Sequence, residues 1–267
     1  MSLPPPAKPV TVPEFRAARS QNRRLAVVTA YEFTAAAIAD AAGVDAILVG
    51  DSLGMVVQGH STSLPVTLSE MAYHTRCVAR AVKRCLIVAD LPFGSYHESP
   101  AQAVRSAVEL IQAGAHAVKL EGGERMADAI AAVVRADIPV MGHVGLTPQS
   151  VHRMGGFKVQ RDAEPLLADA RAVEAAGVFS LVVEGVPSEL GAQVTQAVGV
   201  PTIGIGAGPG CDGQVLVWHD LLGLYDGLRP KFVKRYAELG AAAREAIAAY
   251  CTEVRAGTFP AAEHGFK

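Results

Sequence analysis

One pattern recurs at four places along the chain: a glycine, a short aliphatic run and, in three of the copies, a carboxylate. The copies read Gly43-VDAILVG-Asp51, Gly114-AHAVKL-Glu121, Gly177-VFSLVV-Glu184 and Gly199-VPTIGI-Gly206. A glycine that follows an amphipathic stretch predicts the end of a helix, because glycine adopts a positive φ without steric penalty. An aliphatic run of about six residues, rich in valine and isoleucine, is typical of a strand buried on both faces. The repeated unit is therefore predicted to be a helix, a glycine, a buried strand and a loop.

Further strands extend this alternation. Three more aliphatic runs are predicted strands: Leu25–Thr29, Cys85–Ala89 and Ile138–His143. A doubly wound sheet is disfavoured, since the glycine-rich run from Gly204 to Gly210 lacks the spacing of a dinucleotide fingerprint. Alternating strands and helices over 267 residues favour a (β/α)8 TIM barrel of the α/β class, folded as a single domain.

The eighth strand is the open point of this prediction. Gln214–Trp218 is the candidate, but only about seven residues separate it from Gly206, and a parallel crossover normally needs a dozen or more. The same residues could instead form a helix that Asp212 caps.

The barrel is expected to occupy residues 11–267, after a flexible tail of residues 1–10. Its closing segment, Pro230 to Ala256, is predicted to form one long helix or a broken pair. The side chains expected to face inward there are Phe232, Tyr236, Leu239, Ile247 and Tyr250.

Composition excludes several classes of protein. The 24 basic and 26 acidic residues leave a net charge of -2, which provides no electrostatic surface for nucleic acid. No apolar run reaches the ~18 residues that span a bilayer, and the prolines in the opening MSLPPPAKP do not suit a signal peptide. The widely spaced cysteines favour neither disulfides nor a zinc site. We therefore expect a cytoplasmic protein that acts on small molecules and binds neither nucleic acid nor membrane.

Ionisable residues end five successive predicted strands. In a (β/α)8 barrel the active site lies at the C-terminal ends of the strands, so side chains at these ends gather around one opening. In chain order they are Asp51, Asp90, Lys119 with Glu121, His143 and Glu184.

Most of these residues also have a purely structural explanation. Asp51 and Glu184 could cap the helices that follow them. Lys119 and Glu121 lie two apart in a strand, point to the same side and could form an internal ion pair. His143 could be a structural histidine whose hydrogen bonds are satisfied. Their joint occurrence at neighbouring strand ends favours a functional site.

A group of three carboxylates without a nearby cysteine or paired histidines is a hard oxygen site. Such a site suits Mg²⁺ better than Zn²⁺. A 2-oxo acid could chelate the ion through its carboxylate and keto oxygens, and the ion would stabilise the enolate that forms when the adjacent carbon loses a proton. Glu184 has no obligatory metal role in this arrangement and is the candidate general base, a role typically worth ~10²–10⁴-fold in rate.

A series of motifs runs in order from about Val27 to the end of the chain. They are Asp51-Ser-Leu-Gly-Met55, Gly59-HSTSLPVTLSEMAYH, Asp90-Leu-Pro-Phe93, Val118-Lys-Leu-Glu-Gly122, Gly142-His-Val-Gly-Leu-Thr-Pro-Gln149 and Gly204-IGAG. Together they resemble the ketopantoate hydroxymethyltransferase family, and the motif that begins at Gly59 is highly specific.

This resemblance implies a Mg²⁺-dependent enzyme of pantothenate biosynthesis that folds as a (β/α)8 barrel. The one-carbon donor would be 5,10-methylenetetrahydrofolate, the acceptor 3-methyl-2-oxobutanoate and the product 2-dehydropantoate. The family also forms homo-oligomers, commonly decamers.

The resemblance also implies roles for individual residues. Asp51, Asp90 and Glu121 match the metal positions, and Glu184 matches the proton acceptor. The residues that match the oxo-acid contacts are Asp51, Ser52, Asp90 and Lys119. The folate site is not assigned, and His143 is a candidate either for supporting the metal ligands or for contacting the folate.

Without the family resemblance, the residues would also allow three other functions. A Schiff-base aldolase would use Lys119 as its nucleophile, but a carboxylate as close as Glu121 tends to keep a lysine protonated. A Mg²⁺-dependent carbon–carbon lyase would act on a 2-oxo acid without folate. A protein that only binds an oxo acid would not need a spare carboxylate such as Glu184.

Overall fold

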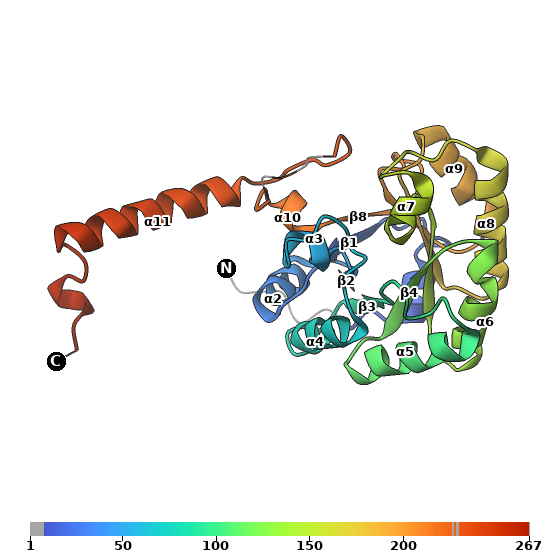
Figure 1. The fold of residues 1–267 in the computed structure, drawn as a ribbon, viewed down its shortest axis with the longest axis horizontal. Helices are drawn as coiled ribbons and strands as arrows, with labels where there is room; N and C mark the ends of the chain where they lie inside the picture. Colours follow the sequence, from blue (N-terminus) through green and yellow to red (C-terminus); the bar gives the residue numbers. More distant parts are fainter. Residues whose placement is uncertain (1–7, 226, 228–229, 267) are drawn as a thin grey trace. The chain divides into compact units, whose positions relative to one another are not determined.

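The computed structural model describes residues 8–225, 227 and 230–266. Eight parallel strands form a closed barrel in which each strand pairs with the next in chain order and β8 pairs with β1 (Figure 1). The strands are β1 (Leu25–Thr29), β2 (Ala46–Val49), β3 (Leu86–Asp90), β4 (Ala117–Glu121), β5 (Val140–Gly145), β6 (Ser180–Glu184), β7 (Thr202–Ile205) and β8 (Gly213–Leu216). The (β/α)8 barrel predicted from the sequence is confirmed.

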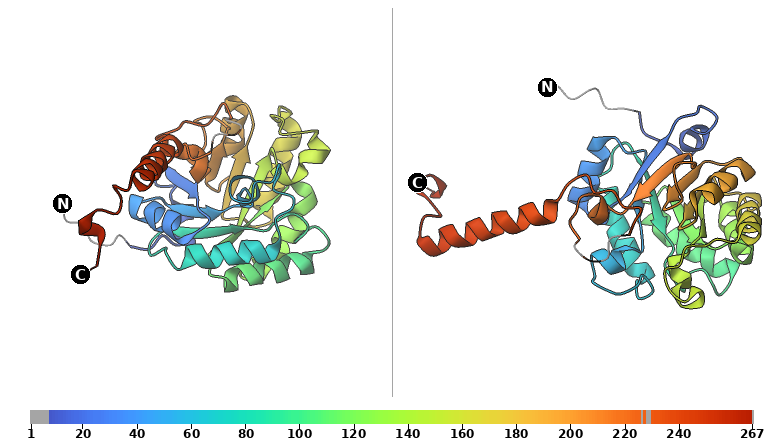
Figure 2. Two further views of the ribbon diagram at one scale, coloured as in Figure 1. Left: turned by 60° about the vertical axis from the view of Figure 1, so that its left-hand side comes forward. Right: turned by 90° about the horizontal axis from the view of Figure 1, so that it is seen from above.

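Helices connect most of these strands and lie around the outside of the barrel (Figures 1 and 2). The longer connecting helices are α2 (Phe33–Ala42), α4 (Leu68–Ala79), α5 (Pro100–Gln112), α6 (Ala127–Arg135), α8 (Ala163–Ala175) and α9 (Ser188–Ala197). The short helical turns are α3 (Leu53–Val56), η1 (Glu124–Met126), η2 (Pro148–Ser150) and α7 (Val151–Met154).

Helix α1 (Val12–Ala17) precedes the barrel and packs against its interior. Phe15 of α1 is fully buried, and its ring meets that of Phe179 edge-on with centroids 5.8 Å apart. The same apolar cluster contains the first residue of four strands: Leu25, Ala46, Leu86 and Ala117. Helix α1 therefore covers the N-terminal end of the barrel, which leaves the C-terminal end for the active site.

Glycine ends the helices at three of the four predicted positions. Gly43, Gly114 and Gly177 have φ values of 91°, 109° and 100°, a conformation that is strained for other residues. Gly199 is different, because α9 ends at Ala197 and is followed by Val198 in an extended conformation. The prediction of a left-handed glycine at Gly199 was wrong, and its N–H donates instead to the carboxylate of Glu174.

The eighth strand forms without a preceding helix. β8 pairs in parallel with β7 through Ile203 and Gly213, and a helix, α10 (Trp218–Leu221), begins only at Trp218. Asp212 does not cap a helix, because its carboxylate accepts the backbone N–H of Thr202 at 2.9 Å and pairs with Arg19 at 2.9 Å. These contacts hold the short connection between β7 and β8 in place. The usual crossover length of a dozen residues therefore did not exclude a strand here.

The chain divides into two compact units, one ending at Val217 and the other beginning at Trp218. The single catalytic domain over residues 11–267 stays a prediction. The second unit contains α10, α11 (Leu239–Ala256) and η3 (Ala262–His264). Residues 1–7 of the expected N-terminal tail lie outside the described residues. Within the described part of the chain, no helix is long and apolar enough to cross a membrane.

The apolar side chains of the C-terminal segment are exposed, contrary to the prediction. The helix α11 begins at Leu239 rather than near Pro230, and none of its residues is buried. The side chains that were expected to face inward, and are exposed, are Phe232, Tyr236, Leu239, Ile247 and Tyr250. Helical spacing correctly predicted an apolar face on this helix, but no described residue of this unit buries it.

Asp40 in α2 fixes the chain where it enters β3. Its carboxylate accepts the backbone N–H groups of Lys83, Arg84 and Cys85 at 3.0, 3.2 and 2.7 Å. Partial burial raises the pKa of Asp40, but these hydrogen bonds outweigh it and hold the pKa below its ordinary value. A lowered pKa in the folded state means that ionised Asp40 stabilises the fold at neutral pH and that this stabilisation is lost in acid.

We therefore expect Asp40→Ala to lower the free energy of unfolding by about 1–2 kcal/mol at pH 7. The difference from wild type should shrink as the pH falls below about 4, where the carboxyl of the unfolded chain becomes protonated. Urea unfolding at pH 7 and pH 3 measures both values, with the exposed Glu109→Ala on α5 as the control. A loss of equal size at both pH values would contradict the role of the ionised carboxylate.

Candidate active site

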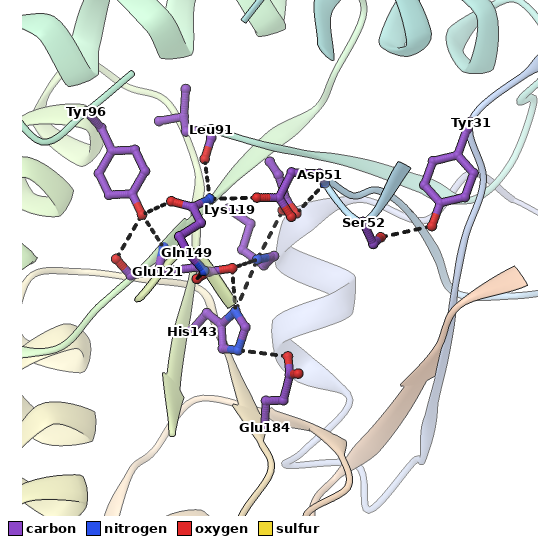
Figure 3. Close-up of polar contacts among 11 residues, drawn as sticks. Tyr31, Asp51, Ser52, Leu91, Tyr96, Lys119, Glu121, His143, Gln149 and Glu184 are labelled. Atoms are coloured by element: carbon purple, nitrogen blue, oxygen red, sulfur yellow. Dashed lines mark hydrogen bonds and ion pairs between the residues drawn. The ribbon is translucent and has the colours of Figure 1, made fainter. Parts of the chain in front are cut away.

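The predicted site residues meet at the C-terminal end of the barrel (Figure 3). Asp90 and Glu121 end β3 and β4, Glu184 ends β6, and Asp51 follows β2 by two residues. Strand pairing sets Asp90 beside Lys119 and Glu121 beside His143. All of these side chains except that of Glu184, which is partly exposed, are at least 96% buried: Asp51, Asp90, Lys119, Glu121 and His143. We call these five buried residues together with Glu184 the catalytic cluster.

The ammonium of Lys119 lies at the centre of the catalytic cluster. Its Nζ is 3.2 Å from Asp90 Oδ1, 3.7 Å from Glu121 Oε1 and 3.1 Å from His143 Nδ1. Burial by itself lowers the pKa of Lys119, but the charges of Asp90, Glu121 and Asp51 raise it above its ordinary value overall. Lys119 is therefore a cation in the site, and the ion pair with Glu121 considered from the sequence is present.

The carboxylates outnumber the positive charge that faces them. Burial raises the pKa of Asp90 to about 7, with the charge of Lys119 opposing this and that of Asp51 adding to it. Burial also raises the pKa values of Asp51 and Glu121 above their ordinary values, although the positive charge of Lys119 lowers them in part. A buried excess of negative charge is costly, so a further cation would stabilise this group in its ionised form.

The chemistry of these groups fits Mg²⁺. All the candidate ligands are carboxylate oxygens, which Mg²⁺ prefers. Asp90 Oδ1 is buried and accepts no hydrogen bond, its contact being the ion pair with Lys119. Among the described residues, no three acidic, histidine or cysteine side chains converge closely enough to form a metal site on their own. Lys119 lies among the carboxylates, where it offsets part of their charge.

His143 connects Lys119 to Glu184. An ammonium can only donate, so Nδ1 of His143 must accept from Lys119, and the neutral ring then carries its proton on Nε2. Nε2 lies 3.2 Å from Glu184 Oε2. Burial and the charge of Lys119 lower the pKa of His143, which favours this neutral form. The Nε2 side of the ring is therefore close to the Glu184 carboxylate, although it makes no hydrogen bond of regular geometry to it.

Neither Asp51 nor Glu184 caps a helix, although the sequence allowed it. The N-cap residues of α3 and α9 are Ser52 and Pro187, and neither has a side-chain capping bond. The backbone N–H of Asp51 donates to Asp90 Oδ2 at 3.0 Å. Ser52 Oγ lies 2.9 Å from the hydroxyl of Tyr31 (Figure 3).

Gln149 and Tyr96 are parts of the site that the sequence reasoning missed. The side-chain amide of Gln149 donates to Asp51 Oδ2 at 2.9 Å and to the carbonyl of Leu91 at 3.0 Å. Its backbone N–H donates to Glu121 Oε2 at 3.0 Å. The hydroxyl of Tyr96 lies 2.7 Å from Gln149 Oε1, which fixes the orientation of the amide. Gln149 ends one of the motifs quoted above, but nothing in that motif indicated a contact with two strand-end carboxylates.

Comparison with known proteins assigns the family. Residues 9–262 match the family described as ketopantoate hydroxymethyltransferase. The chain belongs to the ketopantoate hydroxymethyltransferase family. It is accordingly an enzyme that transfers a one-carbon group, as its motifs predicted.

Relatives in this family match over almost the whole chain. A 3-methyl-2-oxobutanoate hydroxymethyltransferase of Pelobacter propionicus is 54% identical over 97% of this chain and 98% of its own. One of Moorella thermoacetica is 55% identical over 97% of this chain and 98% of its own.

Solved structures confirm the fold at much lower sequence identity. Phosphonopyruvate hydrolase in complex with oxalate and Mg²⁺ aligns with a TM-score of 0.63 and 16% identity, over 95% of this chain and 93% of that one. The 2,3-dimethylmalate lyase of the PEP mutase/isocitrate lyase superfamily aligns with a TM-score of 0.63 and 19% identity, over 97% and 89%. At these identities the likeness concerns the fold alone.

We expect Gln149→Leu to reduce the hydroxymethyltransferase kcat/KM by about 10- to 100-fold, because Asp51 Oδ2 loses the amide donor that orients it. The side chain of Asp51 loses its amide donor, while the backbone N–H to Glu121 is kept. Steady-state kinetics measures the effect, circular dichroism checks the fold, and the exposed Gln112→Leu serves as the control. An unchanged kcat/KM in folded Gln149→Leu would show that Gln149 does not position the site.

Proposed function

We propose that this enzyme transfers a hydroxymethyl group from 5,10-methylenetetrahydrofolate to 3-methyl-2-oxobutanoate, which gives 2-dehydropantoate in pantothenate biosynthesis. The names of relatives at 54% and 55% identity support the acceptor substrate. The observation that carries the chemistry is the buried catalytic cluster. In it the ammonium of Lys119 pairs with Asp90 and Glu121 within reach of the charge of Asp51, and Glu184 stands apart beside His143.

In this proposal Asp51, Asp90 and Glu121 hold Mg²⁺. When bound, the ion supplies a Lewis acid for the negative charge that develops on the oxygens of the oxo acid. Lys119 adds a second, fixed positive charge beside the same carboxylates. Ser52 lies next to Asp51 and offers a hydroxyl for the oxo-acid carboxylate, which is the contact implied by the family motif.

Glu184 is proposed as the base that removes the C3 proton of 3-methyl-2-oxobutanoate. The electron pair of the C–H bond moves into the bond to the keto carbon, and the keto oxygen takes the negative charge. The C–N10 bond of the donor opens to an iminium at N5, and C3 of the enolate forms the new carbon–carbon bond to its methylene carbon while the C=N electron pair returns to N5. Water then replaces N5 at this carbon: the C–N5 bond breaks, tetrahydrofolate leaves with a proton, and the water oxygen becomes the hydroxyl of 2-dehydropantoate. His143 Nε2 lies 3.2 Å from Glu184 Oε2, close enough to stabilise the charge of the carboxylate before the proton transfer.

The rival reactions fit the contacts less well. A Schiff-base aldolase needs a neutral amine, whereas the ammonium of Lys119 is paired with Asp90 at 3.2 Å and Glu121 at 3.7 Å. A carbon–carbon lyase would work without folate, and a protein that only binds the oxo acid would not exchange its C3 proton.

The cytoplasmic location stays a prediction.

Self-association is proposed as well. A homo-oligomer, a decamer by family resemblance, is supported by the exposed apolar side chains of α11, including Ile247 and Tyr250. Light scattering would measure its molar mass.

Exchange of the C3 proton for deuterium, without folate, tests the base directly. The wild-type enzyme with Mg²⁺ should exchange it, and Glu184→Gln should slow the exchange by ~10²–10⁴-fold, since an amide cannot accept the proton. Glu189→Gln, an exposed change in α9, should exchange like wild type. Undiminished exchange in folded Glu184→Gln would refute the assignment.

The complete reaction separates the rivals. Formation of 2-dehydropantoate should require both the folate donor and Mg²⁺, and should stop in EDTA. Activity that survives EDTA, with borohydride trapping of the substrate on Lys119, would instead show a Schiff-base enzyme.

A further inference from the structure

A pocket of about 280 Å³ opens beside the catalytic cluster. Its walls come from the loops that follow β3, β4 and β5, together with Leu64 from the segment between α3 and α4. Glu121 and Gln149 line the pocket as well as belonging to the site. The pocket is therefore continuous with the place where the oxo acid is proposed to bind, yet most of its lining has no part in the chemistry described above.

The loop after β3 gives this pocket an aromatic wall. The ring of His97 lies against Tyr96 with centroids 4.0 Å apart and against Phe93 with centroids 5.1 Å apart. Phe93 is 48% exposed although it is a large apolar side chain, so it has surface available to a ligand. Aromatic rings in contact favour a flat, aromatic partner that can extend the stack.

Two arginines give the same pocket a positive charge. Arg125 follows β4, Arg153 follows β5, and both line the pocket. Within the part of the chain that the structure describes, neither guanidinium forms a salt bridge or a hydrogen bond. Of the described lining residues, Glu121 is the one with a carboxylate, and its side chain is buried in the catalytic cluster. The two arginines are thus free to bind an anion, and a guanidinium matches a carboxylate through two parallel hydrogen bonds.

We propose that this pocket binds the aminobenzoyl-glutamate part of the one-carbon donor. The benzoyl ring would lie against Phe93 and His97, and the glutamate carboxylates would pair with Arg125 and Arg153. An aromatic ring joined to a dicarboxylate matches an aromatic wall beside two unpaired arginines. The inference rests on the proposed function, in which the donor is a folate.

The position of the pocket agrees with the requirement of the reaction. The methylene carbon of the donor must reach C3 of the oxo acid, so the rest of the donor has to leave the catalytic cluster through a space joined to it. The pocket is joined to the cluster at Glu121 and Gln149. Holding the tail there leaves the pteridine end, which bears the methylene group, on the side of the cluster.

The test is the double variant Arg125→Gln, Arg153→Gln. We expect its KM for 5,10-methylenetetrahydrofolate to rise by about tenfold or more, because hydrogen bonds between charged groups are lost. The KM for 3-methyl-2-oxobutanoate and the folate-independent C3 exchange should not change, since the catalytic cluster is untouched. Arg105→Gln, an exposed arginine on α5, is the matched control and should leave all three values as in wild type.

A donor without its glutamate gives a second measurement. Wild-type enzyme should prefer 5,10-methylenetetrahydrofolate over 5,10-methylenetetrahydropteroate, and the double variant should lose most of this preference. A double variant with wild-type donor KM and wild-type preference would overturn the pocket while leaving the proposed function intact. A wild-type enzyme that makes product without any folate would overturn both.

Discussion

The pairing of one buried ammonium with three buried carboxylates is the interaction on which the active site depends. Lys119 contacts Asp90 and Glu121 directly, and its charge also acts on Asp51. Without Lys119 the barrel would have to bury three carboxylates with no opposing charge. The desolvation free energy of such a group is large compared with the free energy of unfolding of an ordinary protein. With Lys119 the group remains rich in negative charge, and this remaining charge is what suits it to a divalent cation.

The rest of the barrel serves to hold this arrangement. Parallel pairing sets Asp90 beside Lys119 and Glu121 beside His143, so neighbouring strands deliver opposite or complementary groups to the same end. Helix α1 covers the other end of the barrel through Phe15. Gln149 donates hydrogen bonds to Glu121 at the end of β4 and to Asp51 in the loop after β2, and so connects two of the carboxylates. Lys119 contacts His143, and His143 lies beside Glu184, which is the most exposed side chain of the catalytic cluster.

Much of this could be predicted from the sequence because the relevant signals are local. Buried parallel strands are aliphatic runs that end in recognisable residues, and the predicted and observed limits of the first strand, Leu25–Thr29, are the same. Barrel geometry then brings strand-end residues together whatever their separation in the chain. The rest depends on contacts between distant segments. The hydrogen bond from Gln149 to Asp51, the support of β8 by Asp212 and the exposure of the apolar face of α11 have no local signal.

The central claim is that these carboxylates bind a divalent ion that the oxo acid chelates. Electron paramagnetic resonance of the protein with Mn²⁺ in place of Mg²⁺ tests it most directly, using 3-methyl-2-oxobutanoate labelled with ¹⁷O in its carboxylate and keto groups. The labelled acid should broaden the lines of protein-bound Mn²⁺ relative to the unlabelled acid, and Asp90→Asn should weaken binding of the ion. Identical lines with the two acids, or no binding of Mn²⁺ by the wild-type protein, would contradict the claim.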